Sequence, residues 1–240
     1  MKEIQLLPLK ECCTIKKKYI WFDLGYTLVY LNREELYQQM LKNHGITLPL
    51  EDIALAYHLA DKYFMREHPG LLGKKRELFM HDYHHILHSY LGIAPMEETQ
   101  PITNKKPEWR VFPETLSILK QLKNTGYQVG LISNWNNTAR EVLQQTGIIH
   151  YLDHVVISSE VGIEKPDERI FQHACQQAGV SPEESLYVGD NYYDDVIGSH
   201  KVGMDCVLIN PYERKGIEEL KNVDPIANIK DLFQKVHMPV

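Results

Sequence analysis

Residues 19–27 of the sequence read YIWFDLGYT, and this stretch decides the fold. Four apolar residues run directly into the carboxylate Asp23, which a glycine follows two positions later. Such a short apolar run is typical of a strand buried in a parallel sheet. A carboxylate that ends a buried strand is aimed by a rigid element, so Asp23 is a candidate reactive group. The structural alternative is an Asp that caps the following turn.

Other apolar runs further along the chain have the same character. They lie at 128–132, 154–157, 186–189 and 205–209. Helical stretches lie between them at 114–125, 138–146 and 168–178, each followed by the glycine expected after a last turn. This alternation predicts right-handed βαβ units, and therefore a doubly wound, Rossmann-like α/β parallel sheet. Ligands of such sheets bind beyond the carboxyl ends of the strands, where Asp23, Ser133 and Asp190 fall.

Residues 32–107 have a different pattern. Helical periodicity covers 32–44, 51–68 and 75–91, with glycine and proline breaks and no strand-like run. A helical block after the first strand predicts a small all-helical cap domain, 32–107, over an α/β core domain formed by 1–31 and 108–240. The proline-containing stretch 94–108 is the predicted return hinge.

Composition restricts the functional class. The chain has 240 residues, 43% hydrophobic and 24% charged, with a formal net charge of −6. This is an ordinary globular mixture without the basic face of a nucleic-acid-binding protein. We find no signal peptide and no membrane-spanning run, so we expect a cytoplasmic protein with neither nucleic acid nor membrane as partner. The sequence gives no indication of oligomeric state.

Four motifs in order resemble those of the haloacid dehalogenase-like (HAD) hydrolase superfamily, in particular members with a helical cap inserted after the first motif. They are Asp23–Leu–Gly–Tyr–Thr27, Ser133–Asn134, Lys165–Pro166 and Gly189–Asp190 with Asp195 five positions later. The resemblance covers residues 18 to about 211. It implies a phosphohydrolase that acts on a small phosphorylated molecule, with Asp23 as the nucleophile of an aspartyl-phosphate intermediate.

The residue chemistry agrees with that resemblance. Ser133 is expected to donate its hydroxyl to a phosphoryl oxygen, and Lys165 to place an ammonium beside the transferring group. Thr27 and Asn134 are the further residues expected to bind phosphate, with turn formation as the alternative for Thr27.

Two anions that meet at phosphorus need a cation between them, and Mg²⁺ takes oxygen ligands. The carboxylates of Asp23 and Asp190 are the expected ligands, and the resemblance adds the backbone carbonyl of Gly25. Asp195 is expected to assist the metal, with the adjacent Asp194 as an alternative. The structural alternative for this acidic pair is a helix N-terminus.

The sequence departs from the family at Gly25, where related phosphatases usually carry a second Asp as general acid and base. Losing that group should cost about 10²–10⁴-fold in rate unless another group protonates the leaving group. Water, Tyr26, His58 and a cap helix with four histidines are candidate sources; the histidines are His81, His84, His85 and His88.

Gly25 also leaves open a phosphate-binding protein with feeble catalysis. A phosphotransferase such as a mutase is a second alternative. A halide leaving group is disfavoured, because dehalogenases of this superfamily lack the metal-binding Gly–Asp pair that this chain keeps at 189–190. Trp135 is expected near the site, in the substrate pocket or the core.

Overall fold

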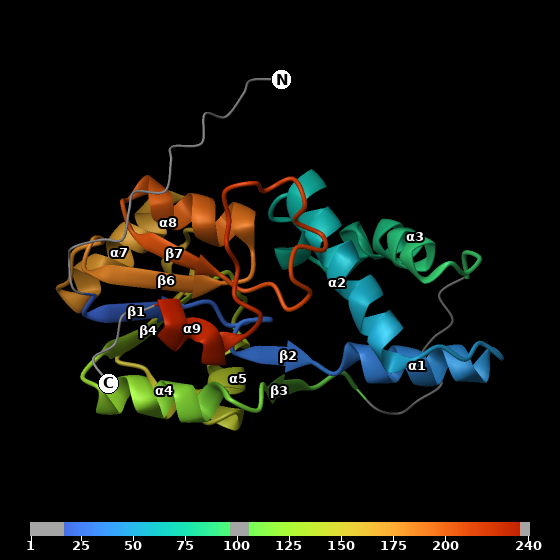
Figure 1. Ribbon diagram of the computed structural model, residues 1–240, viewed down its shortest axis with the longest axis horizontal. Helices are drawn as coiled ribbons and strands as arrows, with labels where there is room; N and C mark the ends of the chain where they lie inside the picture. The colour runs from blue at the N-terminus through green and yellow to red at the C-terminus, as the bar shows by residue number, and fades with distance from the viewer. Residues whose placement is uncertain (1–16, 97–105, 236–240) are drawn as a thin grey trace, which may run out of the picture.

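The computed structural model describes residues 17–96 and 106–235, and a five-stranded parallel sheet forms its centre (Figure 1). The strand order is β5-β4-β1-β6-β7. The bounds are Tyr19–Phe22 for β1, Gln128–Ser133 for β4, His154–Ile157 for β5, Ser185–Gly189 for β6 and Asp205–Leu208 for β7. This sheet with helices on both faces confirms the predicted doubly wound α/β core.

Strand β1 shows why both faces are covered. Its side chains alternate, so Ile20 and Phe22 pack into one hydrophobic cluster and Tyr19 and Trp21 into another. Helices α4 (Thr115–Asn124) and α5 (Ala139–Gln145) cover the first face, and α7 (Glu168–Ala178) and α8 (Ile197–Lys201) the second (Figure 1). A strand buried on both faces is apolar throughout, as the sequence showed.

The sheet register brings three chain segments to one edge. Phe22 lies opposite Leu131 of β4 and opposite Val188 of β6. The Asp23 N–H continues the β1–β6 ladder, donating to the Val188 carbonyl at 2.9 Å. The residues that follow β1, β4 and β6 therefore leave the sheet side by side.

The cap helices lie beyond those strand ends (Figure 1). They are α1 (Arg33–Asn43), α2 (Leu50–Glu67) and α3 (Met80–Leu91), and they enclose a hydrophobic cluster of their own. Helix α2 lies between the core and α3 (Figure 1). The predicted helix 75–91 is shorter in the structure, because a 3-10 turn, η2 (Arg76–Leu78), precedes α3.

A two-stranded antiparallel sheet joins the two parts of the molecule. It pairs β2 (Val29–Leu31) with β3 (Trp109–Val111), and the sequence did not predict it, because three residues are too few for periodicity. Residues 97–105 of the predicted hinge lie outside the described residues, so the exact domain bounds stay a prediction.

The remaining elements are short. They are η1 (Leu71–Gly73), η3 (Ile148–Tyr151), α6 (Ser158–Val161), a π-helical turn labelled η4 (Tyr192–Val196), η5 (Ile229–Asp231) and α9 (Leu232–Lys235). Within residues 17–96 and 106–235, no helix combines the length and the apolar character needed to span a bilayer.

Candidate active site

Asp23 is the centre of the site. Its side chain receives a hydrogen bond from Ser133 Oγ at 3.0 Å and one from Lys165 Nζ at 2.8 Å. Both donors bind the same oxygen, Oδ1, and no described residue donates a hydrogen bond to Oδ2. Asp23 is 9% exposed, so its charge depends on these two partners rather than on bulk water. The structure thus brings together the three residues predicted to be catalytic.

Lys165 is held by oxygen acceptors on all three of its N–H groups. Besides Asp23 they are Asp195 Oδ1 at 2.6 Å and the Tyr187 hydroxyl at 2.8 Å. Burial alone would lower the pKa of Lys165, but the charges of Asp195 and Asp23 outweigh it and hold the pKa well above its ordinary value. Lys165 therefore stays an ammonium.

Asn134 fixes the loop that carries Lys165. Its amide group donates to the Lys165 carbonyl at 2.9 Å, and its amide oxygen accepts from the Lys165 N–H at 2.8 Å. This two-point contact occupies both ends of the amide. Asn134 therefore positions Lys165 in this structure, and direct phosphate binding by its side chain stays a prediction.

The two neighbouring acids after β6 have different environments. Asp195 is fully buried, pairs with Lys165, and accepts from the Asn191 N–H at 3.0 Å. Asp194 accepts from the Asn191 side chain at 2.9 Å, but its Oδ1 is buried without a hydrogen-bond partner. Burial is the main cause that raises the pKa of Asp194 to about 7.

Asp190 has the same electrostatic character. Burial first, and then the charges of Asp23 and Asp195, raise its pKa to about 7 despite the opposing charge of Lys62. Two buried carboxylates with raised pKa and one orphaned oxygen are the signature of a site that lacks positive charge.

The residues present therefore fit a divalent cation. No group of three or more His, Cys, Asp or Glu with ligating geometry occurs in the described part of the chain. Mg²⁺ needs no such cage, because it is commonly bound through one or two carboxylates, with waters and substrate phosphate completing its shell. Asp23, Asp190 and the Gly25 carbonyl would hold it, and the unpartnered Oδ1 favours Asp194 as the assisting acid.

The loop after Asp23 shows why position 25 is small. A Cβ at Gly25 would lie 3.3 Å from a ring carbon of Trp135 and 3.9 Å from one of Trp109. Those two indoles pack together, with ring centroids 4.6 Å apart. A Cβ at this position would therefore meet Trp135 more closely than an ordinary contact allows. Thr27 follows with its hydroxyl buried and unpartnered, as a donor awaiting a ligand oxygen would be.

The candidate replacement acids are not equally placed. Tyr26 packs under the Arg33 guanidinium, and burial raises its pKa well above its ordinary value, which makes it a reluctant proton donor. His58 donates from Nε2 to the Lys215 carbonyl at 3.0 Å. Burial is the first cause that lowers its pKa to about 4, so it is neutral and carries no extra proton.

The four cap histidines lie on α3, which α2 separates from the core (Figure 1). His88 is buried against the Tyr37 hydroxyl at 2.7 Å, whereas His81 and His85 are exposed. The structure thus does not bring this helix to Asp23.

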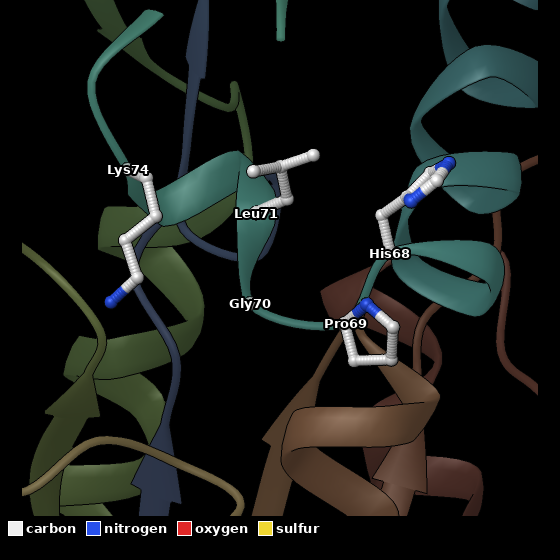
Figure 2. Close-up of a pocket in the computed structure, with 5 residues that line it drawn as sticks. All are labelled: His68, Pro69, Gly70, Leu71 and Lys74. Atoms are coloured by element: carbon white, nitrogen blue, oxygen red, sulfur yellow. The ribbon is translucent and has the colours of Figure 1, made fainter. Parts of the chain in front are cut away.

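A pocket of about 300 Å³ opens at the end of α2 (Figure 2). It is lined by His68, Pro69, Gly70, Leu71 and Lys74. Lys74 forms an ion pair with Glu164 at 2.8 Å. Glu164 directly precedes Lys165, so this ion pair connects the rim of the pocket with the loop that carries Lys165.

Sequence reasoning missed two residues of the site. Tyr187 lies under Lys165 and donates to the Ile132 carbonyl at 2.7 Å, but within an apolar strand it looks like core. Lys62 of α2 reaches the core and donates to the Asp190 carbonyl. Its signal was weak, because a lysine off the apolar stripe of an amphipathic helix normally faces solvent.

Comparisons with known proteins identify the family of the chain. A family model described as haloacid dehalogenase-like hydrolase matches residues 20–209. A glyceraldehyde 3-phosphate phosphatase of Methanothermobacter thermautotrophicus is 39% identical over 133 residues, which are 52% of this chain and 59% of that protein. A pyrimidine 5′-nucleotidase of Escherichia coli is 26% identical over 92% of this chain and 98% of its own. The structure of a HAD phosphatase from Thermococcus onnurineus, 25% identical, superposes with a TM-score of 0.57 over 92% of this chain and 98% of that one.

Proposed function

The chain belongs to the haloacid dehalogenase-like hydrolase family, and on this premise we propose that it is a magnesium-dependent phosphatase. It would hydrolyse a small phosphomonoester through a phospho-aspartate on Asp23. The observation that carries the proposal is the pair of donors, Ser133 and Lys165, on one oxygen of the Asp23 carboxylate. That arrangement leaves the other oxygen to attack phosphorus.

In the first half-reaction, Asp23 Oδ2 forms a bond to phosphorus while the bond from phosphorus to the leaving oxygen breaks. The ammonium of Lys165 lowers the repulsion between the carboxylate and the phosphoryl dianion, and the Ser133 hydroxyl holds the carboxylate in its attacking orientation. Asp195 and Tyr187 keep the ammonium in place. Water then cleaves the acyl phosphate, which restores Asp23 and releases inorganic phosphate.

Asp23, Asp190 and the Gly25 carbonyl would hold the metal, with Asp194 assisting. When bound, Mg²⁺ would supply the positive charge that offsets the nucleophile and the transferring phosphoryl group. The raised pKa values of Asp190 and Asp194 support this proposal, because they identify carboxylates that need a cation to stay ionised at neutral pH.

The leaving oxygen needs a proton, and Gly25 cannot supply one. Because Trp135 and Trp109 border this position, we propose that water or the substrate itself provides the proton. The enzyme should therefore favour substrates whose leaving group is a weak base. This requirement also keeps a feeble phosphate-binding role as the second candidate function.

The relatives support a small phosphorylated substrate, since one is named for a sugar phosphate and another for nucleotides. The presence of Asp190, a predicted metal ligand, supports phosphoryl transfer and speaks against dehalogenation.

The test is turnover of p-nitrophenyl phosphate with Mg²⁺ and with EDTA. Its leaving group needs little protonation, so we expect metal-dependent release of nitrophenol and phosphate that Asp23→Asn abolishes. Absence of turnover with Mg²⁺ still bound would instead favour the binding protein. Transfer of the phosphoryl group to an added sugar, without phosphate release, would identify a phosphotransferase.

A further inference from the structure

Lys62 belongs to the cap, yet its ammonium lies in the catalytic core. It donates to the backbone carbonyl of Asp190 and lies 3.6 Å from Asp190 Oδ2. The residue is only 6% exposed, which is rare for a lysine whose ion pair is as long as 3.6 Å. The burial of this ammonium beside Asp190, a proposed metal ligand at the end of β6, has to be explained.

The position of Lys62 is built into the fold. A Cβ at Gly216 would lie 2.9 Å from Lys62 Cβ and Cγ, so the glycine makes room for the lysine stem. The preceding residue, Asp61, is fixed by Arg33 and by the Tyr83 hydroxyl at 2.6 Å. These contacts determine which way this turn of α2 faces.

Lys62 also lies on the face of α2 that docks on the core. His58, Lys62 and Arg66 are spaced four residues apart, which places them on one side of a helix. His58 contacts the Lys215 carbonyl, and Arg66 lies 3.5 Å from Glu219. The ammonium of Lys62 is therefore the part of this docking face that meets the proposed catalytic residues.

The hydrogen bonds of Lys62 are incomplete. An ammonium has three N–H donors. Those of Lys165 all reach oxygen within 2.8 Å, whereas Lys62 has one carbonyl oxygen, one carboxylate oxygen at 3.6 Å, and the thioether sulfur of Met65 at 3.8 Å. Sulfur is a weak acceptor. The ammonium of Lys62 can therefore donate a further hydrogen bond to an anionic oxygen. A buried N–H group without a good acceptor destabilises the fold.

We propose that Lys62 is a phosphate-binding residue, which the cap supplies to the site and which binds an oxygen of the substrate's phosphoryl group. This inference deepens the proposed function and rests on it. It would also link the cap to the substrate, because the phosphoryl dianion would then join the cap and the core through one cation.

The experiment is calorimetric titration of inorganic phosphate into the 240-residue chain with saturating Mg²⁺. We expect Lys62→Met to weaken phosphate binding by about tenfold or more, since a desolvated charge-assisted hydrogen bond is lost. Lys62→Arg, which keeps the charge, should retain part of the affinity. The matched control is Lys42→Met, which removes an exposed lysine of α1 and should leave phosphate affinity unchanged.

Unchanged phosphate affinity in Lys62→Met would overturn the inference. So would tighter Mg²⁺ binding with unaltered phosphate affinity, because Lys62 would then be only a counter-ion of Asp190. If Lys62→Met fails to fold by circular dichroism, Lys62→Gln gives the same comparison. The proposed function fails separately, through absent turnover by the wild-type protein, and that result leaves the phosphate titration interpretable.

Discussion

Asp194 and Asp195 are adjacent acids. Replacing either one by the neutral Asn should change the stability of the metal-free protein, and the two replacements should act in opposite directions. Asp194 has an ordinary pKa of 3.8, raised to about 7 in the fold by burial first and by neighbouring acids. At 1.36 kcal/mol for each pH unit, ionised Asp194 destabilises the folded protein by up to about 4 kcal/mol at pH 8.

The sign follows from the direction of the pKa change. The native state binds this proton more tightly than the unfolded state, so stability falls as the pH rises from about 4 to about 7 and then levels off. Asp194→Asn cannot ionise, and its side-chain oxygen still accepts from Asn191. We therefore expect it to gain about 1–4 kcal/mol at pH 8 without metal, and nothing at pH 4.

Asp195→Asn should have the opposite effect. It removes one of the two carboxylates that surround the buried Lys165 ammonium. Breaking a buried ion pair from one side costs about 3–5 kcal/mol. The two variants therefore differ by more than the error of a denaturation experiment.

The assay is urea unfolding of both variants and the wild type at pH 8 with EDTA, followed by titration with Mg²⁺. We expect Asp194→Asn to be the more stable protein without metal and to lose Mg²⁺ affinity. A destabilised Asp194→Asn, or one that binds Mg²⁺ as tightly as the wild type, would refute the assignment of the assisting role to Asp194.

Three further predictions follow from individual contacts. Gly25→Asp should lower the free energy of unfolding by about 1–3 kcal/mol in denaturant unfolding, because its side chain crowds Trp135. In a Trp135→Ala background the same change should accelerate alkyl phosphate hydrolysis by about 10²-fold. No rate gain in that background would contradict the steric account. Tyr187→Phe should lower kcat about fivefold with little change in KM, because Lys165 loses an acceptor worth about 1 kcal/mol; steady-state kinetics measures this, and a change confined to KM would oppose it. Because the pKa of His58 is lowered to about 4, stability should be lost as the pH falls from 6.5 toward 4; His58→Gln should flatten that profile in urea unfolding, and parallel profiles would exclude His58 as the cause.

The architecture could be predicted because its signals are local. Each of the five sheet strands is an apolar run, and the rule that parallel strands end at one edge was enough to bring Asp23, Ser133 and Asp190 together. Lys165 was predicted from the family resemblance. The cytoplasmic location stays a prediction.

What the sequence could not provide are contacts between distant segments. The tight contact that a Cβ at position 25 would make with Trp135 depends on how two loops pack, and neither loop reveals it alone. Lys62 has the helix position of a lysine that faces solvent. It is buried because α2 packs against the core as well as against α3, and the sequence of α2 does not reveal this second contact. Asn134 has the residue type of a phosphate ligand, yet its amide is used to hold Lys165.

The central claim is that Asp23 becomes phosphorylated during turnover, and chemical trapping tests it most directly. The wild-type protein, mixed with Mg²⁺ and p-nitrophenyl phosphate, is quenched with borohydride, which reduces an acyl phosphate to an alcohol, and the peptides are then identified by mass spectrometry. We predict reduction of Asp23 to homoserine, dependent on substrate and metal. Continued turnover with Asp23 unmodified, or with the modification on another carboxylate, would contradict the account.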